Sequence, residues 1–260
     1  MIGLRWGCVV DKFSQELGDD ELLRYSRQIL LDGWDMDAQI RLKCANVLLI
    51  GAGGLGCPVA QILTRAGVGQ LHLIDHDVID DSNLQRQVLF TKDDIGKPKA
   101  TVAKTALERQ NHLITITAST QKITPDNVKH LIDGYDLVID GTDNFAVRDV
   151  INQACMSNHL PLLSNSAIGE TGQIALFDGV GCYHCVFGGV GDDERNCANS
   201  GVLASTVAVI GSMTAQIALD YLGRGNNPIK GELLIWQGKT MRLQKLHYLK
   251  NPDCPVCAIF

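Results

Sequence analysis

The chain of 260 residues has no surplus of basic side chains. It holds 23 Lys and Arg against 29 Asp and Glu, for a formal net charge of -6. A protein that binds along a nucleic-acid backbone needs excess cationic charge to neutralise the phosphates. The composition therefore argues against a nucleic acid as partner, although it allows a local basic pocket.

Long uninterrupted apolar runs are also missing. Residues 1–13 contain no apolar core of the length that a signal peptide needs, and they reach an acid at Asp11. The most apolar later stretch, residues 202–222, is broken by polar side chains such as Gln216 and Asp220, which is typical of a buried helix rather than a membrane span. We therefore expect a cytoplasmic protein that does not insert into a membrane.

Cysteine, by contrast, is plentiful, with nine in the chain. Without an export signal, this number favours thiols and metal ligands over a disulfide framework. Two C-x-x-C pairs stand out, Cys182 with Cys185 and Cys254 with Cys257. Each pair can supply two thiolates, so together they predict a closed tetrahedral site for structural Zn²⁺. A redox-active C-x-x-C pair is the alternative, and His184 inside the first pair is expected to stay outside the metal shell.

Strand-like and helix-like segments alternate over the first 160 residues. Runs of β-forming residues at 45–50, 71–74, 114–120 and 137–139 are predicted strands, and periodic segments at 58–66, 99–108 and 125–131 are predicted helices. This order is typical of a parallel sheet with helices on both faces. It predicts a Rossmann-like, doubly wound α/β fold.

An amphipathic helix is predicted before this alternation begins. It starts with the capping acids Asp19 and Asp20. One face is marked by the spacing of Leu22, Leu23, Ser26, Ile29 and Leu30. Arg24 and Arg27 fall on its polar side.

The character of the sequence changes after Pro161. Candidate strands at 160–168, 173–177, 232–236 and 241–249 enclose only one long helix. No low-complexity linker separates this mixed β half from the part before it. We therefore expect one domain over residues 1–260, with a nucleotide-binding half at 19–160 and a mixed β half at 161–260 that holds the four-cysteine zinc site.

A glycine cluster follows the first predicted strand directly. Gly51-Ala52-Gly53-Gly54-Leu55-Gly56 fits G-x-G-x-x-G, in which small residues let the turn close and helix amides meet a phosphate. Asp75 ends the next strand, where an acid commonly binds ribose hydroxyls. By themselves, these features are most typical of a dinucleotide-dependent oxidoreductase.

A polar set further along the chain favours a different nucleotide. It comprises Asn83, Gln85, Arg86, Gln87, Lys97, Lys99, Asp143 and Asn144. Cationic groups and a carboxylate at strand ends suit a triphosphate with Mg²⁺ better than a nicotinamide ring, which needs an apolar slot. Each residue alone is also compatible with an ordinary surface charge or a helix cap.

Cys197 stands in a stretch rich in Gly, Asp and Asn, residues 188–202, that predicts a loop. Its thiol is a candidate nucleophile or sulfur acceptor, because the neighbouring Arg195 would favour the thiolate. An unreactive exposed cysteine is an equally good interpretation of the same residue.

Several motifs follow one another along nearly the whole chain: RYSRQILL, GAGGLG, LIDHD, SNLQRQ, GKPK, DGTDN and the two cysteine pairs. In this order they resemble the MoeB/ThiF adenylating enzymes related to ubiquitin-activating enzyme. The resemblance implies a homodimer that binds ATP and Mg²⁺, with the metal on Asp143 and zinc on the four cysteines. The residues that it assigns to the nucleotide are Gly54, Asp75, Ser82, Asn83, Leu84, Gln85, Arg86, Lys99, Asp143 and Asn144.

The resemblance also assigns two residues that local patterns leave open. It implies that Arg27 reaches into the active site of the other subunit. Cys197 matches a position that carries sulfur or thioester chemistry in some members. The half at 161–260 is expected to hold the surface that binds the protein substrate.

The implied reaction joins a protein to a nucleotide. The C-terminal glycine carboxylate of a ubiquitin-like sulfur-carrier protein attacks the α-phosphorus of ATP, which gives an acyl-adenylate and pyrophosphate. No protein base is needed, because a carboxylate is already ionised at neutral pH. Catalysis then consists of positioning two anions and neutralising the growing charge on the phosphate oxygens, which suits Arg27, Arg86, Lys99 and a metal on Asp143.

The sequence is less informative about which carrier is activated. Residues 194–197 (ERNC) and 24–32 resemble ThiF, which serves thiamine synthesis through the carrier ThiS. Residues 19–28 and 166–173 (SAIGETGQ) are compatible with MoeB, which serves molybdopterin synthesis through a MoaD-type carrier, although Gly169 stands where MoeB proteins often carry Arg. We favour the MoaD type, because MoeB-type members are the commoner stand-alone form.

The sequence ends shortly after Cys257, so we expect that the protein lacks a rhodanese domain and that a separate protein donates the sulfur. Two other classes of function stay open. A nucleotide-dependent oxidoreductase would consume NADH with a suitable substrate. A non-catalytic, zinc-stabilised binding module would bind ATP without exchanging pyrophosphate.

Overall fold

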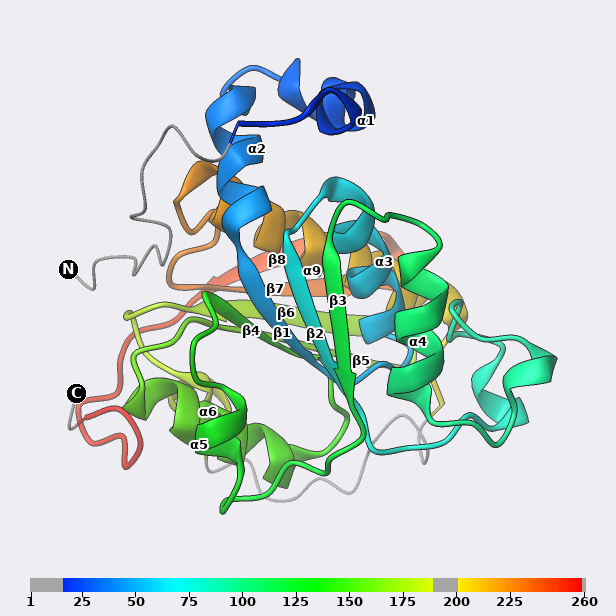
Figure 1. The fold of residues 1–260 in the computed structure, drawn as a ribbon. Coiled ribbons are helices and arrows are strands. Elements are labelled where there is room, and N and C mark those ends of the chain that lie inside the picture. Colours follow the sequence, from blue (N-terminus) through cyan, green and yellow to red (C-terminus); the bar gives the residue numbers. More distant parts are fainter. Residues whose placement is uncertain (1–15, 189–200, 259–260) are drawn as a thin grey trace.

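The structure of the chain is a computed structural model that describes residues 16–188 and 201–258. Its centre is one eight-stranded sheet in the order β3-β2-β1-β4-β5-β6-β7-β8 (Figure 1). The strands are β1 (Asn46–Ile50), β2 (Gln70–Ile74), β3 (Thr115–Ser119), β4 (Leu137–Asp140), β5 (Leu162–Ile168), β6 (Thr171–Phe177), β7 (Glu232–Gln237) and β8 (Arg242–His247). Both halves that the sequence predicts thus contribute strands to a single sheet.

The sheet changes from parallel to antiparallel at β5. From β3 to β5 the neighbours are parallel, so that Val47 of β1 lies opposite both Leu71 and Leu137, whereas β5 to β8 are antiparallel. Parallel neighbours need a crossover, usually a helix, while a hairpin needs only a turn. The turn between β5 and β6 contains Gly169, whose φ of 60° favours glycine. The predicted fold class is confirmed.

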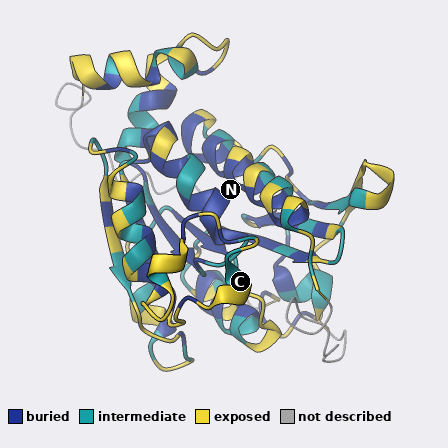
Figure 2. Ribbon diagram, turned by 90° about the vertical axis from the view of Figure 1, so that its right-hand side faces the viewer, coloured by how far each residue is buried: buried dark blue, intermediate teal, exposed yellow. Residues whose placement is uncertain are grey.

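Helices cover both faces of this sheet (Figures 1 and 2). One face carries α2 (Asp35–Cys44), α3 (Gly56–Ala66), α4 (Lys99–Glu108) and α9 (Ala204–Arg224). The other face carries α5 (Val128–Leu131), α6 (Phe145–Ser157) and α7 (Tyr183–Phe187). Within residues 16–188 and 201–258, none of the helices combines the length and the apolar character that a bilayer crossing needs.

The strands contribute side chains to two separate hydrophobic cores, because successive side chains of a strand point to opposite faces of the sheet. Val47 and Leu49 of β1 belong to the core beneath α3 and α9, whereas Leu48 and Ile50 belong to the core beneath α5 and α6. None of the four side chains is more than 2% exposed. Burial on both faces explains why this strand appears in the sequence as a continuous apolar run.

Helix α1 (Asp19–Ile29) projects from the rest of the molecule as an arm (Figures 1 and 2). Tyr25 anchors it: the hydroxyl accepts a hydrogen bond of 2.8 Å from Asn111 Nδ2, and a Cβ atom on Gly67 would come within 2.5 Å of the ring. The apolar face identified from the sequence is only partly covered: Leu23 and Leu30 are 79% and 74% exposed, whereas Leu22, Ser26 and Ile29 are half-buried. Part of this face is therefore open to solvent in the single chain.

The structure corrects the helix predicted at 125–131 and adds helices that the prediction omits. Residues 125–127 form a turn, because the Asn127 side chain accepts a hydrogen bond of 2.8 Å from Thr124 N, and only Val128–Leu131 is helical. Helices α2, α6 and α7 are absent from the prediction. The chain also forms 3-10 turns at η1 (Asp81–Asn83) and η2 (Lys92–Asp94), and at η3 (Gly238–Thr240) before β8.

Candidate functional site

The loops after β1, β2 and β4 gather where the strand order of the sheet reverses. The parallel strands extend from β1 in two directions, to β2 and β3 on one side and to β4 and β5 on the other. Loops diverge at such a switch point and leave a crevice at the carboxyl ends of the strands. The loops after β1 and β4 approach each other closely at the base of this crevice, because a Cβ atom on Gly51 would lie 3.0 Å from the backbone of Gly141. The fold thus brings the GAGGLG and DGTDN motifs to the same end of the sheet.

The glycine-rich loop owes its shape to positions that tolerate no side chain. Gly51 has a φ of 94°, in the left-handed region. A Cβ atom on Gly56 would meet the Gly51 carbonyl oxygen at 1.9 Å, so α3 begins in direct contact with the end of β1. The first amides of an α-helix have no intrahelical partner and attract anions. The start of α3 is therefore suited to bind a phosphate.

Asp75 ties the end of β2 to the glycine-rich loop. Its Oδ2 accepts a hydrogen bond of 2.7 Å from Ala52 N, and its Oδ1 accepts one of 2.9 Å from Asp77 N. Burial raises the pKa of Asp75, and the two backbone hydrogen bonds and Lys99 oppose this rise. Each carboxylate oxygen keeps a second lone pair. Asp75 can therefore also accept hydrogen bonds from ribose hydroxyls, as the sequence suggests.

Lys99, at the start of α4, is a buried cation at this end of the sheet. It is 6% exposed, and its Nζ lies 2.9 Å from Oδ2 of Asp77. A buried ammonium group needs a compensating charge, and Asp77 supplies it. The sequence interpretation did not identify Asp77, although its place two residues after Asp75 was a signal.

Arg86 lies across the glycine-rich loop. A Cβ atom on Gly54 would be 3.3 Å from both Cγ and Cδ of Arg86, so the stem of this arginine passes over the glycine. Its guanidinium donates a hydrogen bond of 3.0 Å to the Ser82 carbonyl oxygen. Asp80 shapes this segment by accepting a hydrogen bond of 2.9 Å from Ser82 N at the start of η1. Arg86 is thus held beside the phosphate end of the crevice.

The other predicted nucleotide residues of this segment differ in their surroundings. Ser82 and Gln85 are exposed, and Asn83 is half-buried. Asn83 Oδ1 accepts a hydrogen bond of 3.2 Å from Asp80 N, so this side chain also shapes the turn. Leu84 packs against the core, which leaves its backbone better placed than its side chain for a polar ligand.

Asp143 and Asn144 stand in the loop between β4 and α6, and both are exposed. Asn144 caps α6, because its Oδ1 accepts a hydrogen bond of 3.1 Å from Val147 N. Burial, and to a smaller extent the neighbouring Asp143, raises the pKa of Asp140 at the end of β4. An exposed carboxylate at this position is a suitable ligand for Mg²⁺.

Arg27 lies apart from all of these residues in the single chain. It is an exposed residue of α1, which packs through Tyr25 against Gly67, just before β2 begins. The arm therefore sits at the starts of the parallel strands, whereas the crevice lies at their ends (Figure 1). The structure does not bring Arg27 to the crevice of the same chain.

The two cysteine pairs meet as the sequence predicts. The Sγ atoms of Cys182 and Cys254 are 3.7 Å apart, those of Cys185 and Cys257 are 3.4 Å apart, and those of Cys182 and Cys185 are 3.9 Å apart. Four tetrahedral Zn–S bonds of about 2.3 Å require S···S separations of about 3.8 Å. The cluster therefore fits a four-thiolate metal ion. Cys197, the remaining predicted site residue, lies outside the described residues.

Two buried polar residues beside these sites carry no simple signal in the sequence. Arg148 is 6% exposed, although an arginine is usually a surface residue, and Asn152 is fully buried. Burial raises the pKa of the Cys182 thiol to about 11, and the Asn152 amide is among the groups that lower it. The spacing of four from Asn144 to Arg148 and Asn152 would have placed all three on one side of a helix.

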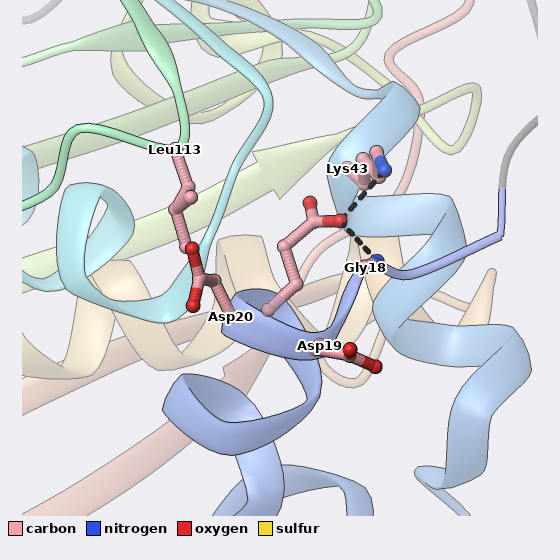
Figure 3. A pocket seen from close by; sticks show the side chains of 6 residues that line it. Gly18, Asp19, Asp20, Lys43 and Leu113 are labelled. Atoms are coloured by element: carbon pink, nitrogen blue, oxygen red, sulfur yellow. Dashed lines mark hydrogen bonds and ion pairs between the residues drawn. The ribbon is translucent and has the colours of Figure 1, made fainter.

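A cavity of about 590 Å³ lies beside α1, away from the crevice (Figure 3). It is lined by Gly18, Asp19, Asp20, Glu21, Lys43 and Leu113. Glu21 Oε2 accepts hydrogen bonds of 2.7 Å from Lys43 Nζ and 2.9 Å from Gly18 N, so three of the lining residues are bonded to one another. The acidic first turn of α1 makes this cavity unsuitable for a triphosphate, and we assign it no function.

Comparison with known proteins agrees with this arrangement. The model of the ThiF family matches residues 25–256. A molybdopterin-synthase adenylyltransferase of Salmonella typhimurium is 41% identical over 245 residues, which cover 93% of this chain and 98% of the relative. The sulfur carrier protein ThiS adenylyltransferase of Escherichia coli K12 is also 41% identical, over 93% of this chain and 97% of the relative.

The likeness extends to a solved structure. The crystal structure of Escherichia coli MccB with ATP has a TM-score of 0.76 and 25% sequence identity to this chain, and the match covers 85% of this chain and 69% of MccB. The match to the family model spans most of the chain. The protein belongs to the ThiF family.

Proposed function

We propose that the protein uses ATP to adenylylate the C-terminal carboxylate of a ubiquitin-like sulfur-carrier protein. The observation that carries the proposal is the meeting of the glycine-rich loop, Arg86 and the buried Lys99 at the switch point of the sheet. The two relatives described above are named as adenylyltransferases, which supports the same reaction here. The charged side chains at this crevice do not favour a nicotinamide ring.

The residues of the crevice have different roles in binding ATP and in the reaction. The start of α3 and Lys99 bind the phosphates, and Asp75 accepts hydrogen bonds from the ribose. The carrier's carboxylate forms a bond to the α-phosphorus, the bond from this phosphorus to the pyrophosphate oxygen breaks, and pyrophosphate leaves. Arg86 and Lys99 stabilise the charge that develops on the phosphate oxygens. No proton moves, because the attacking carboxylate is already ionised.

We assign Mg²⁺ to Asp143, the exposed carboxylate between β4 and α6. Mg²⁺ held there would neutralise negative charge on the triphosphate. Asn144 uses its side-chain oxygen to cap α6 and carries no negative charge, so it is a weaker metal ligand than a carboxylate. Asp143 is therefore the stronger candidate of the two for the metal.

We further infer that the active form is a homodimer. Leu23 of the arm, and Leu30 and Leu31 directly after it, are 79%, 74% and 53% exposed, and a second copy would remove this apolar surface from water. Arg27 is on the same arm and lies away from its own crevice. Only the other subunit's crevice is available to it, so its role in charge stabilisation requires action between subunits.

The carrier is proposed to bind at the half formed by residues 161–260. β8 is the last strand of the described sheet, and each of its residues is exposed. An edge strand offers unpaired backbone groups to an incoming chain. Leu243 and Leu246 add apolar surface there, at 45% and 50% exposure. Both relatives are 41% identical to this chain, and we favour the MoaD-type carrier over ThiS because MoeB-type members are the commoner stand-alone form.

The four cysteines are proposed to hold a structural Zn²⁺. Four thiolates leave no open coordination position for water or substrate. The metal would join the segment after β6 to the end of the described chain, so its binding energy becomes folding energy of this half. Cys197 stays a candidate for sulfur transfer, with the sulfur supplied by a separate donor protein.

The proposal is tested by the product of the reaction. The protein is incubated with MgATP and a purified carrier, and the intact mass of the carrier is measured. A mass increase of one adenylyl group, which is AMP less one water, supports adenylylation. An unchanged carrier together with NADH oxidation would favour an oxidoreductase instead.

A further inference from the structure

Helix α6 runs from the loop of Asp143 to the cysteine cluster. Asn144 is its N-cap, and Arg148 and Asn152 follow at intervals of four, so the three lie along one side of the helix. Arg148 is 6% exposed and Asn152 is 0% exposed. Polar side chains buried to this degree need partners. Their partners show what the helix connects.

At the nucleotide end, Arg148 holds the residue that precedes Asp143. Its guanidinium donates a hydrogen bond to the Thr142 carbonyl oxygen and lies close to the buried Asp140. Asp140 Oδ1 accepts hydrogen bonds of 2.9 Å from Thr142 N and 2.7 Å from Thr142 Oγ1. Thr142 is thus hydrogen-bonded to both Arg148 and Asp140, and the direction of the next side chain, Asp143, depends on these hydrogen bonds.

At the other end, the same helix holds the residue that follows a cysteine of the cluster. Tyr183 N donates a hydrogen bond of 3.0 Å to Asn152 Oδ1. The nearby Arg148 guanidinium opposes the rise that burial causes in the pKa of the Tyr183 hydroxyl. Tyr183 is 3% exposed and packs against the rings of Phe177 and Phe187 at centroid distances of 6.4 Å and 4.6 Å. Tyr183 therefore has little freedom to move independently of Cys182 or of α6.

Asn152 also faces the metal cluster. Its Nδ2 is buried without a hydrogen-bond partner of ordinary geometry among the described residues, and it is close enough to interact with the Cys182 sulfur. A metal-bound sulfur accepts such a donor, and outer-shell contacts of this kind orient the metal ligands. Metal binding at the cluster can therefore affect the position of Asn152 and Tyr183 and, along α6, that of Arg148.

We propose that Tyr183 is a positioning residue that couples the cysteine cluster to the loop of Asp143, so that metal bound by the four cysteines strengthens the binding of MgATP. The inference rests on the proposed function. Coupling between two binding sites is reciprocal, so MgATP must strengthen metal binding by the same factor. A tyrosine that only stabilises the core would not make either affinity depend on the other ligand.

The test uses the full-length dimer and Zn²⁺ as the metal. Zinc affinity is measured by competition with a chromophoric chelator, with and without MgATP, and MgATP binding to the zinc-loaded protein is measured by calorimetry. Tyr183→Phe removes the hydroxyl on which the Arg148 charge acts and keeps the ring and the backbone amide. The matched control is Tyr248→Phe, which removes a part-buried hydroxyl that donates to the Leu176 carbonyl oxygen at 3.4 Å.

We expect MgATP to tighten zinc binding about tenfold in the unaltered protein and in Tyr248→Phe, and by about twofold or less in Tyr183→Phe. Asn152→Leu, which removes the second contact to Tyr183, should show the same loss. The inference would be overturned if MgATP did not change the zinc affinity of the unaltered protein. It would also be overturned if MgATP tightened zinc binding by the full factor in both Tyr183→Phe and Asn152→Leu. Absence of MgATP binding would overturn the proposed function itself, whereas MgATP binding without linkage overturns the coupling alone.

Discussion

Lys99 and Asp77 form an ion pair in which the lysine side chain is buried and the aspartate side chain is exposed. The Nζ and Oδ2 atoms are 2.9 Å apart, and the two side chains are 8% and 54% exposed. Lys99 N also donates a hydrogen bond of 3.0 Å to the Asp77 carbonyl oxygen, so backbone and side chain hold the lysine in the same place. The ammonium group is therefore fixed beside Asp75 before any nucleotide arrives.

Replacing this cation should affect catalysis more than folding. Lys99→Met keeps most of the buried stem and removes the charge that stabilises the phosphate oxygens. We expect carrier-dependent ATP–pyrophosphate exchange to fall by about 100-fold or more in kcat/KM. Lys92→Met, which removes an exposed lysine of η2, is the control and should retain normal exchange. A folded Lys99→Met protein with near-normal exchange would show that Lys99 does not act on the phosphates.

Asp143→Ala should abolish pyrophosphate exchange and leave the fold intact. The carboxylate is exposed, so its removal costs little stability, but it is our assigned ligand for Mg²⁺. The measurement pairs exchange kinetics with a thermal melt. Asp133→Ala removes another exposed carboxylate, after α5, and should leave both quantities unchanged. Normal exchange by folded Asp143→Ala protein would refute the metal assignment.

The crevice was largely predictable from the sequence, because its parts are local. The glycine-rich loop and Asp75 follow strands whose apolar runs are easy to recognise, and parallel strands bring their carboxyl ends together. The cysteine cluster was predictable because C-x-x-C pairs carry their chemistry in their spacing. In both cases a motif and a topology were sufficient.

The buried connection between the two sites was not predictable in the same way. Arg148 and Asn152 look like ordinary polar residues of a helix, and they are buried because α6 packs against α7 and against the sheet. The exposure of Leu23 on the arm escaped prediction for the opposite reason. Its spacing is that of a packed face, and whether such a face is covered depends on tertiary and quaternary contacts that periodicity does not report.

Mixing two inactive variants tests whether Arg27 acts between subunits. Arg27→Ala and Arg86→Ala homodimers should each be nearly inactive. A mixed dimer contains one crevice in which both arginines are present, so exchange activity should recover to about a quarter of normal after random reassortment of subunits. Subunit exchange is verified with two differently tagged chains. Verified mixed dimers without recovered activity would exclude action in trans.

Cys254→Ser should lower zinc content and thermal stability together. Loss of one thiolate weakens the metal site, and a loss of about 3 kcal/mol corresponds to a fall in Tm of about 10 °C for a chain of this size. Cys197→Ala is the matched control and should change neither quantity. Zinc analysis and melting curves are recorded for both. A stable, zinc-free Cys254→Ser protein would show that the metal is not structural.

The central claim is the adenylylation of a carrier, and the most direct measurement is the intact mass of the carrier after incubation with MgATP and this protein. The experiment is run in parallel with a purified MoaD-type carrier, a purified ThiS-type carrier, and each carrier without its terminal glycine. We predict a carrier mass increased by one adenylyl group, which hydroxylamine removes as AMP. We expect the MoaD type to react faster and the truncated carriers not to react. Unmodified mass in both full-length carriers, under conditions in which the protein binds MgATP, would contradict the account.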